Sequence, residues 1–241
     1  MTRNAKTCGP TRRTLLKTVA AGAALAAVAP RALRAAGPNR FVFARARYRS
    51  GDWDADPKMP LNVLNSVVEY TRVAVEGREE VVGLDSKDLA GYPFLYLTGH
   101  ELVRFTKGEK ENVGRYVADG GFLFVDDCNH DVDGLFARSL ERELWDLFPR
   151  QLKAIPNDHE LYQAAFHFPA GPPTTHHELN GWGDNLVHEE LKGIEVKGVL
   201  NLVYSNKDYG CEWDYDPPSK QYLAEDNTKF AVNLITYAMC R

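Results

Sequence analysis

The fold is decided by two apolar stretches, YPFLYLTGH (residues 92–100) and GGFLFVDDC (residues 120–128). Each is a run of apolar residues that ends abruptly in polar ones, which is typical of strands buried on both faces of a parallel sheet. The segment between them predicts a helix, because Thr106 and Glu109 have capping-box spacing and two glycines end the pattern. A strand, a covering helix and a second parallel strand form the basic unit of an α/β sheet.

The same alternation extends in both directions along the chain. Further strands are predicted at residues 41–48 and 199–204. Further helices are predicted from Pro60 onward and over residues 132–148 and 226–239. We therefore expect a three-layer α/β fold with a doubly wound, mainly parallel sheet.

The composition fits one domain over residues 37–241. Of the 241 residues, 44% are hydrophobic, which is enough apolar material for one substantial core. Prolines and glycines interrupt residues 156–198, which we interpret as an irregular insertion rather than a second domain. After residue 40, no stretch of about eighteen residues is continuously apolar, which argues against a multispan membrane domain.

Charge is distributed unevenly between the leading segment and the rest of the chain. The first 36 residues hold seven of the 29 basic residues and none of the 33 acidic ones. The remaining 22 basic and 33 acidic residues give residues 37–241 a net charge of −11, against −4 for the whole chain. This charge opposes binding to nucleic acid and favours a cationic, metal-bearing or neutral partner.

Residues 1–36 resemble a twin-arginine export signal. The motif Thr11-Arg12-Arg13-Thr14-Leu15-Leu16-Lys17 is followed by a short, Ala-rich apolar stretch at residues 19–29. Cleavage after Ala29, cleavage near Ala35 and retention as an anchor all fit, and the alternative is a plain amphipathic helix. The signal predicts a periplasmic or otherwise exported protein that meets the twin-arginine translocase during export.

Three cysteines, Cys128, Cys211 and Cys240, follow this segment, and Cys8 lies within it. Their odd number allows one disulfide at most, which excludes a disulfide-rich scaffold. No C-x-x-C occurs, so a structural zinc site on thiolates is not indicated.

Polar residues follow three of the predicted strands where each strand ends. Because the carboxyl ends of parallel strands share one edge of a sheet, we expect these residues to converge there. The ligand-binding candidates at this edge are Gly99, His100, Asp126, Asp127, Asp208, Tyr209 and Trp213. Trp213 could stack on a sugar or an organic cation, or it could seal the core beneath a long loop.

The segment DDCNHD (residues 126–131) offers oxygen and imidazole ligands suited to a divalent metal. The metal candidates are Asp126, Asp127, His130, Asp131 and His159. The alternative is structural: the aspartates cap the following turn and helix, and His159 makes a structural hydrogen bond. The pair His176-His177 is expected to lie solvated in a loop.

These stretches resemble a bacterial family, domain of unknown function 4159. The resemblance covers about residues 40–240 and is carried by residues 92–100 and 116–128, Phe148-Pro149, Asp158-His159, Tyr204-Ser205, Asp208-Tyr209 and residues 233–237. It implies a flavodoxin-like relative of the class I glutamine amidotransferase superfamily and carries over no activity. That superfamily places its nucleophilic cysteine in a G-x-C-x-G turn. Cys128 departs from this pattern, because it lacks the glycines and its acidic neighbours disfavour a thiolate.

Two classes of function remain open. The first is an exported binding or accessory protein that holds a small molecule, a metal or an envelope protein at the carboxyl edge. The second is a metal-assisted hydrolase in which Asp126, Asp127 and His130 hold the ion and His100 or His159 moves protons. The sequence contains no P-loop, G-x-G-x-x-G, H-E-x-x-H or G-x-S-x-G motif, which favours the first class.

Overall fold

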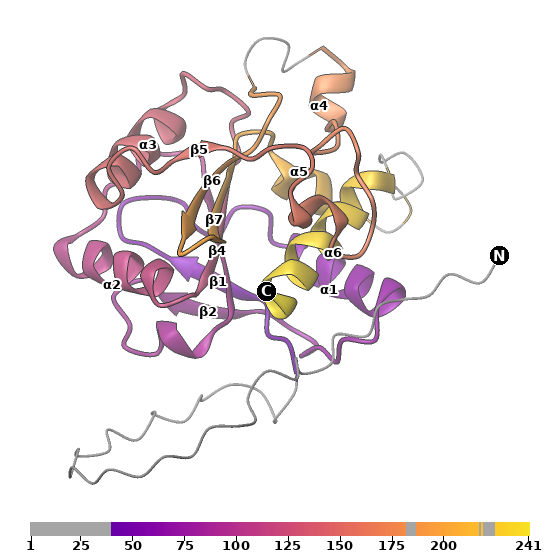
Figure 1. Ribbon diagram of the computed structural model, residues 1–241, viewed down its shortest axis with the longest axis horizontal. Coiled ribbons are helices and arrows are strands. Elements are labelled where there is room, and N and C mark those ends of the chain that lie inside the picture. Colours follow the sequence, from indigo (N-terminus) through magenta and orange to yellow (C-terminus); the bar gives the residue numbers. More distant parts are fainter. Residues whose placement is uncertain (1–39, 182–186, 217, 219–224) are drawn as a thin grey trace, which may run out of the picture.

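A seven-stranded sheet with the order β2-β1-β3-β4-β7-β6-β5 organises the chain (Figure 1). The computed structural model describes residues 40–181, 187–216, 218 and 225–241, so the predicted export signal lies outside the described residues. The strands are β1 (Ala44–Arg47), β2 (Glu80–Gly83), β3 (Phe94–Gly99), β4 (Phe122–Asp127), β5 (Lys153–Ala154), β6 (Lys192–Val196) and β7 (Val199–Ser205).

Five neighbouring strands, β2, β1, β3, β4 and β7, are parallel, whereas β6 and β5 extend the sheet in antiparallel fashion beyond β7. This confirms the prediction of a mainly parallel α/β sheet. The register pairs Asp126 of β4 with Thr98 of β3 on one side and with Ser205 of β7 on the other. The carboxyl ends of these three strands therefore lie level at one edge.

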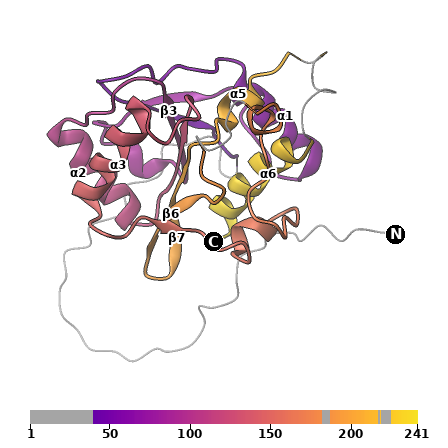
Figure 2. The same ribbon diagram turned by 90° about the horizontal axis from the view of Figure 1, so that it is seen from above.

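Helices cover both faces of the sheet, which gives three layers. Figures 1 and 2 both show α2 and α3 on one face and α1, α5 and α6 on the other. The helices are α1 (Met59–Tyr70), α2 (Lys107–Ala118), α3 (Leu135–Leu147), α4 (His176–Leu179), α5 (Tyr209–Trp213) and α6 (Glu225–Cys240), with short 3-10 turns η1 (Leu89–Gly91) and η2 (Glu160–Gln163). The predicted capping box of α2 is present, since Thr106 and Glu109 exchange side-chain and backbone hydrogen bonds.

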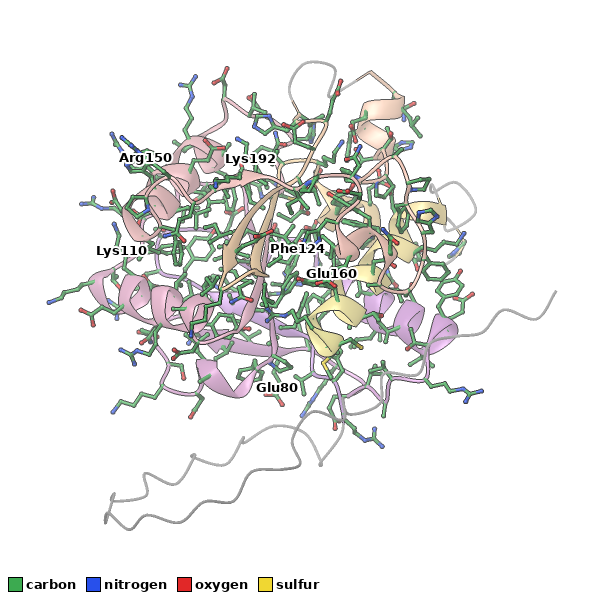
Figure 3. The ribbon with its side chains drawn as sticks, in the orientation of Figure 1. Glu80, Lys110, Phe124, Arg150, Glu160 and Lys192 are labelled. Carbon is green, nitrogen blue, oxygen red and sulfur yellow. The ribbon has the colours of Figure 1, made fainter. Side chains whose placement is uncertain are left out.

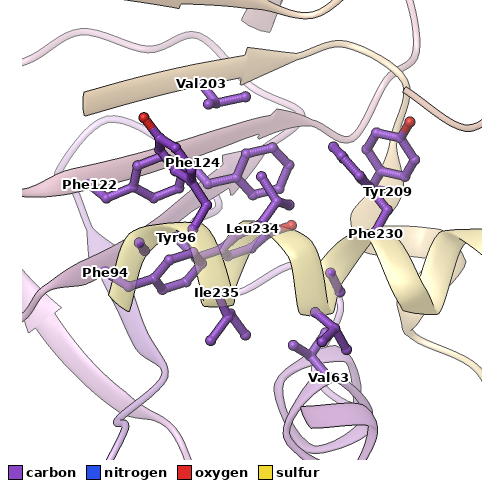
Figure 4. Packing of buried hydrophobic residues seen from close by; sticks show 14 of the residues in the cluster. Val63, Phe94, Tyr96, Phe122, Phe124, Val203, Tyr209, Phe230, Leu234 and Ile235 are labelled. Atoms are coloured by element: carbon purple, nitrogen blue, oxygen red, sulfur yellow. The ribbon is translucent and has the colours of Figure 1, made fainter. Parts of the chain in front are cut away.

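The two faces of β3 and β4 explain why their sequences are continuously apolar. On one face, Phe94, Phe122 and Phe124 pack toward Leu234 and Ile235 of α6 (Figure 4). On the other face, the alternate residues of the same strands belong to a second core cluster together with residues of α2 and α3. Because every residue of both strands is buried, no polar alternation can appear until the strands end.

The range predicted as an irregular insertion, residues 156–198, contains η2, α4 and the strand β6. Asn233 of α6 holds the first part of it in place. Its buried side chain accepts hydrogen bonds from the amides of Ala165 and Phe166 and donates one to the carbonyl oxygen of Leu161. One amide side chain thus supplies the pairing that a strand would otherwise provide.

The distribution of charge follows this layering. Lys110 and Arg150 lie at the periphery in Figure 3, whereas Phe124 lies at the centre.

Among the described helices, none combines the length and apolarity needed to cross a bilayer.

Candidate functional site

The carboxyl ends of β3, β4 and β7 come together as the sequence predicts. The carboxylate of Asp126 accepts a hydrogen bond of 2.6 Å from the amide of Gly210, two residues beyond Asp208. The side-chain amide of Asn129 donates to the carbonyl oxygen of His100 at 2.8 Å. His100, Asp126 and Asp208 therefore lie on one edge of the sheet.

Four side chains at this edge form a compact group, which we call the Cys–Asp cluster: Asp56, Cys128, Asp208 and Cys211. One oxygen or sulfur atom from each lies within 4.8 Å of the corresponding atom of every other member. The two sulfur atoms are 3.6 Å apart. The Asp56 carboxylate bridges them, with one oxygen 3.4 Å from the sulfur of Cys128 and the other 3.5 Å from that of Cys211.

Two histidines, which we call the His pair, extend this cluster through Asp208. The same oxygen of Asp208 lies 3.2 Å from Nε2 of His177 and 3.4 Å from Nδ1 of His130. The two imidazole rings are stacked with their centroids 4.6 Å apart. Asp208 therefore belongs to two groups of candidate metal ligands at once.

A buried arginine on β1 positions Asp56. Only 1% of the Arg45 side chain is exposed, and its guanidinium forms an ion pair of 2.7 Å with Glu79. The same group donates to the carbonyl oxygens of Ala55 and Asp56, which fixes the loop that follows β1. The loop conformation that presents the Asp56 carboxylate is thus tied to the central sheet.

The segment that carries His177 is held by contacts with the segment that carries Asp208. Glu178 forms a largely buried ion pair of 2.5 Å with Lys207. The backbone amide of His176 donates to the carboxylate of Glu212. These contacts flank His177 on both sides and hold its ring against Asp208.

The backbone is strained at three members of the site. Asp56, His130 and Asp208 have φ values of 58°, 40° and 59°, and they are three of the five described non-glycine residues with positive φ. Such conformations cost free energy and gather at sites where a side chain must be presented in one direction. Aspartate tolerates the left-handed region better than most residues, which suits it to these positions.

Gly210 allows the backbone before Cys211 to approach Asp56. A Cβ atom at Gly210 would clash with the Asp56 carboxylate and would lie 2.6 Å from the hydroxyl oxygen of Tyr96. No residue with a side chain fits there without moving the cluster.

The site combines an ion pair, formed by Asp208 and His177, with a neutral thiol, that of Cys128. Burial would raise the pKa of Asp208, but hydrogen bonds with His130 and His177 outweigh it and lower that pKa. The hydrogen bond with Asp208, assisted by Cys211, raises the pKa of His177 to about 10. The hydrogen bond with Cys211 and burial raise the pKa of the Cys128 thiol. At neutral pH, Asp208 and His177 therefore form a charged pair beside a protonated Cys128.

The family model described as "Domain of unknown function (DUF4159)" matches residues 42–239. The chain belongs to this family. A comparison with curated proteins gives no match. Membership in DUF4159 confirms the family resemblance stated for the sequence, and the Cys–Asp cluster and the His pair lie within the matched range.

Within the DUF4159 domain, Asp126 and Asp127 lie behind the Cys–Asp cluster and belong to neither group of candidate ligands. Both are fully buried, and burial raises the pKa of Asp126 well above its usual range and that of Asp127 to about 7. Asp127 accepts a hydrogen bond of 3.0 Å from the amide of Asn129, and Asp131 accepts one from the amide of Asp133. These contacts match the turn that the structural alternative predicts, but neither aspartate caps the helix, because α3 has Gly134 as its N-cap residue with no side-chain cap hydrogen bond.

The other residues that the sequence offered as ligands in the DUF4159 domain make structural contacts outside the two groups of candidate metal ligands. Nδ1 of His100 is 2.6 Å from a carboxylate oxygen of Asp52, and a Cβ atom at Gly99 would clash with a neighbouring tyrosine hydroxyl. Nδ1 of His159 accepts a hydrogen bond from a backbone amide at the start of η2 and belongs to neither ligand group. Tyr209 and Trp213 stack on each other in the core, which is the sealing role considered for Trp213.

Sequence reasoning missed four members of these two groups as ligands: Asp56, Cys128, His177 and Cys211. Asp56 lies in the acidic loop after β1, and the rule that ligands gather at strand ends could have included it. His177 was expected to be solvated, but the exposed fraction of its side chain is only 17%.

Proposed function

We propose that this protein is an exported binding or accessory protein that holds a zinc-like divalent ion at the Cys–Asp cluster. The spacing of the cluster is the observation that supports this. Zinc binds sulfur at about 2.3 Å and oxygen at about 2.0–2.2 Å, so tetrahedral ligands lie roughly 3.3–3.8 Å from one another. The two sulfur atoms, 3.6 Å apart, and the Asp56 oxygen 3.4 Å from the sulfur of Cys128 fall in this range, and one ligand atom from each of the four residues lies within 4.8 Å of the other three.

The chemistry of the four ligands also favours zinc over harder ions. Two thiolates with two carboxylates form a donor set that is softer than calcium or magnesium prefers. The His pair adjoins Asp208 and would orient that carboxylate toward the ion, as partners of metal ligands commonly do.

Four protein ligands favour binding over catalysis. Structural zinc sites have four protein ligands, whereas catalytic sites keep one position for water or substrate. Metal-assisted hydrolysis is the second candidate, and the observation in its favour is the His pair, which could move protons beside the ion. It requires that one of the four ligands give way to water.

We also propose that the domain has a flavodoxin-like fold. The five parallel strands follow the order β2-β1-β3-β4-β7, which corresponds to the flavodoxin-like order 2-1-3-4-5. This order supports a flavodoxin-like domain related to class I glutamine amidotransferases. In such sheets the ligand lies at the carboxyl edge, where the Cys–Asp cluster is found.

We further propose that the protein is exported to the periplasm by the twin-arginine pathway. Export is supported by the Arg12-Arg13 motif and by the Ala-rich apolar stretch at residues 19–29 that follows it. Replacing both arginines by lysine should retain the protein in the cytoplasm. Cell fractionation measures this, and unchanged export would contradict it. A small molecule or an envelope protein is the expected partner.

Metal analysis of the full chain tests the proposed function. Protein purified without chelator should contain about one equivalent of metal per chain, and added zinc should raise its melting temperature. The Cys128→Ser and Asp208→Asn variants should lose the metal. Cys240→Ser is the matched control and should retain it, because Cys240 lies at the far end of α6. A folded wild type that takes up no zinc would overturn the proposal.

A further inference from the structure

The two thiols of the Cys–Asp cluster are in contact although 83 residues separate them in the sequence. Their sulfur atoms are 3.6 Å apart, whereas a disulfide bond is about 2.05 Å long, so closure requires an approach of roughly 1.5 Å. Cys128 directly follows β4, and Cys211 lies in the five-residue helix α5. Closure therefore requires a movement of the two side chains or of this short helix.

The two cysteines differ in accessibility. Cys211 is exposed, whereas Cys128 is buried with only 4% of its surface accessible. An external disulfide can therefore reach Cys211 first, and Cys128 lies directly behind it. An accessible attacking thiol with a second thiol in contact is the arrangement that thiol–disulfide exchange uses.

We infer that Cys128 and Cys211 form a reversible disulfide by exchange with a small-molecule or protein disulfide. The thiolate of Cys211 attacks one sulfur of the external disulfide, whose S–S bond breaks and releases one thiolate. The thiolate of Cys128 then attacks the sulfur of Cys211 and displaces the second external thiolate.

The exchange is balanced in electrons and protons. Two protein thiols lose two electrons and become one disulfide, and the external disulfide gains those electrons and becomes two thiols. The two protons pass from the protein thiols to the released thiolates. Asp56 can relay them, because its two carboxylate oxygens lie 3.4 Å and 3.5 Å from the two sulfur atoms.

The disulfide changes what the Cys–Asp cluster can hold. Metal ions bind thiolates, so the oxidised pair no longer supplies the two sulfur ligands. This consequence rests on the proposed function, whereas formation of the bond does not. The cluster would hold either the ion or the disulfide, and the redox state of its surroundings would decide between them.

Oxidation of the full chain tests the inference. The reduced, chelator-treated protein is incubated with oxidised glutathione and digested, and its peptides are analysed by mass spectrometry. A cross-linked peptide joining Cys128 and Cys211 is expected, lighter by about 2 Da than its separate thiol peptides, and dithiothreitol should abolish it. A wild type that keeps both thiols reduced, or that carries only glutathione adducts, overturns the inference. No variant has to fold for this result.

Variants define the order of the exchange. Cys240→Ser should form the same cross-link, since Cys240 ends α6, and in the last turn of that helix the hydroxyl of Tyr237 accepts a hydrogen bond from the amide of Leu200, near the amino end of β7 and not at its carboxyl end, where the cluster lies. Cys128→Ser should retain one glutathione on Cys211, because the thiol that would displace it is missing. A cross-link between Cys211 and Cys240 instead would contradict the assigned pair.

Zinc separates this inference from the proposed function. At a zinc concentration of about 100 times Kd, only about 1% of the protein is metal-free, so oxidation should slow about 100-fold. If the disulfide forms at the same rate with zinc present, the inference stands and the proposed function fails. If zinc binds but the zinc-free protein forms no disulfide either, the inference fails and the proposed function stands.

Discussion

The guanidinium of Arg45 donates to the main-chain oxygen of Asp56 at 3.0 Å, which joins strand β1 of the sheet to the Cys–Asp cluster. The donor is almost completely buried, and its other partners are Glu79 and the carbonyl oxygens of Trp53 and Ala55. Asp56 has a positive φ, so its loop needs such support to keep one conformation. A residue remote from the ligands thus helps to determine the site geometry.

We expect Arg45→Met to lower the free energy of unfolding by about 2–4 kcal/mol, because several acceptors lose a buried donor. Zinc affinity should fall as well, since Asp56 is no longer held. Urea denaturation and zinc titration measure the two effects. Arg40→Met is the control: Arg40 forms an exposed ion pair of 3.9 Å with Glu76, and its loss should cost less than about 1 kcal/mol. Equal effects of the two substitutions would contradict this role of Arg45.

Gly210→Ala should disturb the Cys–Asp cluster directly. The new Cβ atom would meet the Asp56 carboxylate and the Tyr96 hydroxyl, which should cost about 1–3 kcal/mol of stability and weaken zinc binding. Gly108→Ala, in the first turn of α2, is the matched control, because a Cβ there has no neighbour within 4 Å. That variant should be as stable as the wild type or more stable by up to about 1 kcal/mol. Thermal denaturation compares them, and a neutral Gly210→Ala would refute the close approach.

Lys207→Met should release the segment that carries His177. Lys207 is 3% exposed, and its removal leaves the Glu178 carboxylate poorly solvated, which should cost about 3 kcal/mol. Hydrogen exchange should increase at the amides of α4. Lys107→Met, which removes an exposed pair with Glu111, should change stability by less than about 0.5 kcal/mol. Unchanged exchange at α4 in the Lys207 variant would show that other contacts hold His177.

The raised pKa of Asp127 predicts how stability depends on pH in the metal-free protein. Burial raises this pKa from 3.8 to about 7, so the folded state binds the proton more tightly than the unfolded state. The resulting stabilisation is fully present below pH 3.8 and is lost as pH rises through about 7. Asp127→Asn removes the ionisation. It should therefore be about 1–3 kcal/mol more stable than the wild type at pH 8 and little different near pH 4.

Urea denaturation across this pH range measures the difference between Asp127→Asn and the wild type. Asp133→Asn is the control, because the Asp133 side chain is 74% exposed. A gap that stayed constant with pH would show that Asp127 is ionised in the folded protein.

The central sheet could be predicted because burial on both faces of β3 and β4 leaves a plain apolar signature. The antiparallel strand β6 could not, since its sequence KGIEV is short and mixes polar with apolar residues. Pairing with β7 makes it a strand, and that partner is known only once the sheet is assembled.

The meeting of His100, Asp126 and Asp208 at one edge was also predictable, because it follows from parallel topology. The ligand set was not. Asp56 and His177 reach the cluster through buried contacts with Arg45 and with the segment around Lys207, and neither contact leaves a periodic pattern in the sequence. Of the metal candidates in DDCNHD, only His130 belongs to a group of candidate ligands, with His177 and Asp208, whereas Cys128, which was not a candidate, belongs to the Cys–Asp cluster.

The side chains of the Cys–Asp cluster come from remote parts of the chain: Asp56 is 72 residues from Cys128 and 155 from Cys211. An unfolded chain would have to close very long loops to gather them, so ion capture must follow assembly of β1, β4 and β7. An ion would therefore bind late and stabilise the folded protein, and it would not act as a folding nucleus. Its main kinetic effect would be slower opening of the native protein, with the rate of folding left nearly unchanged.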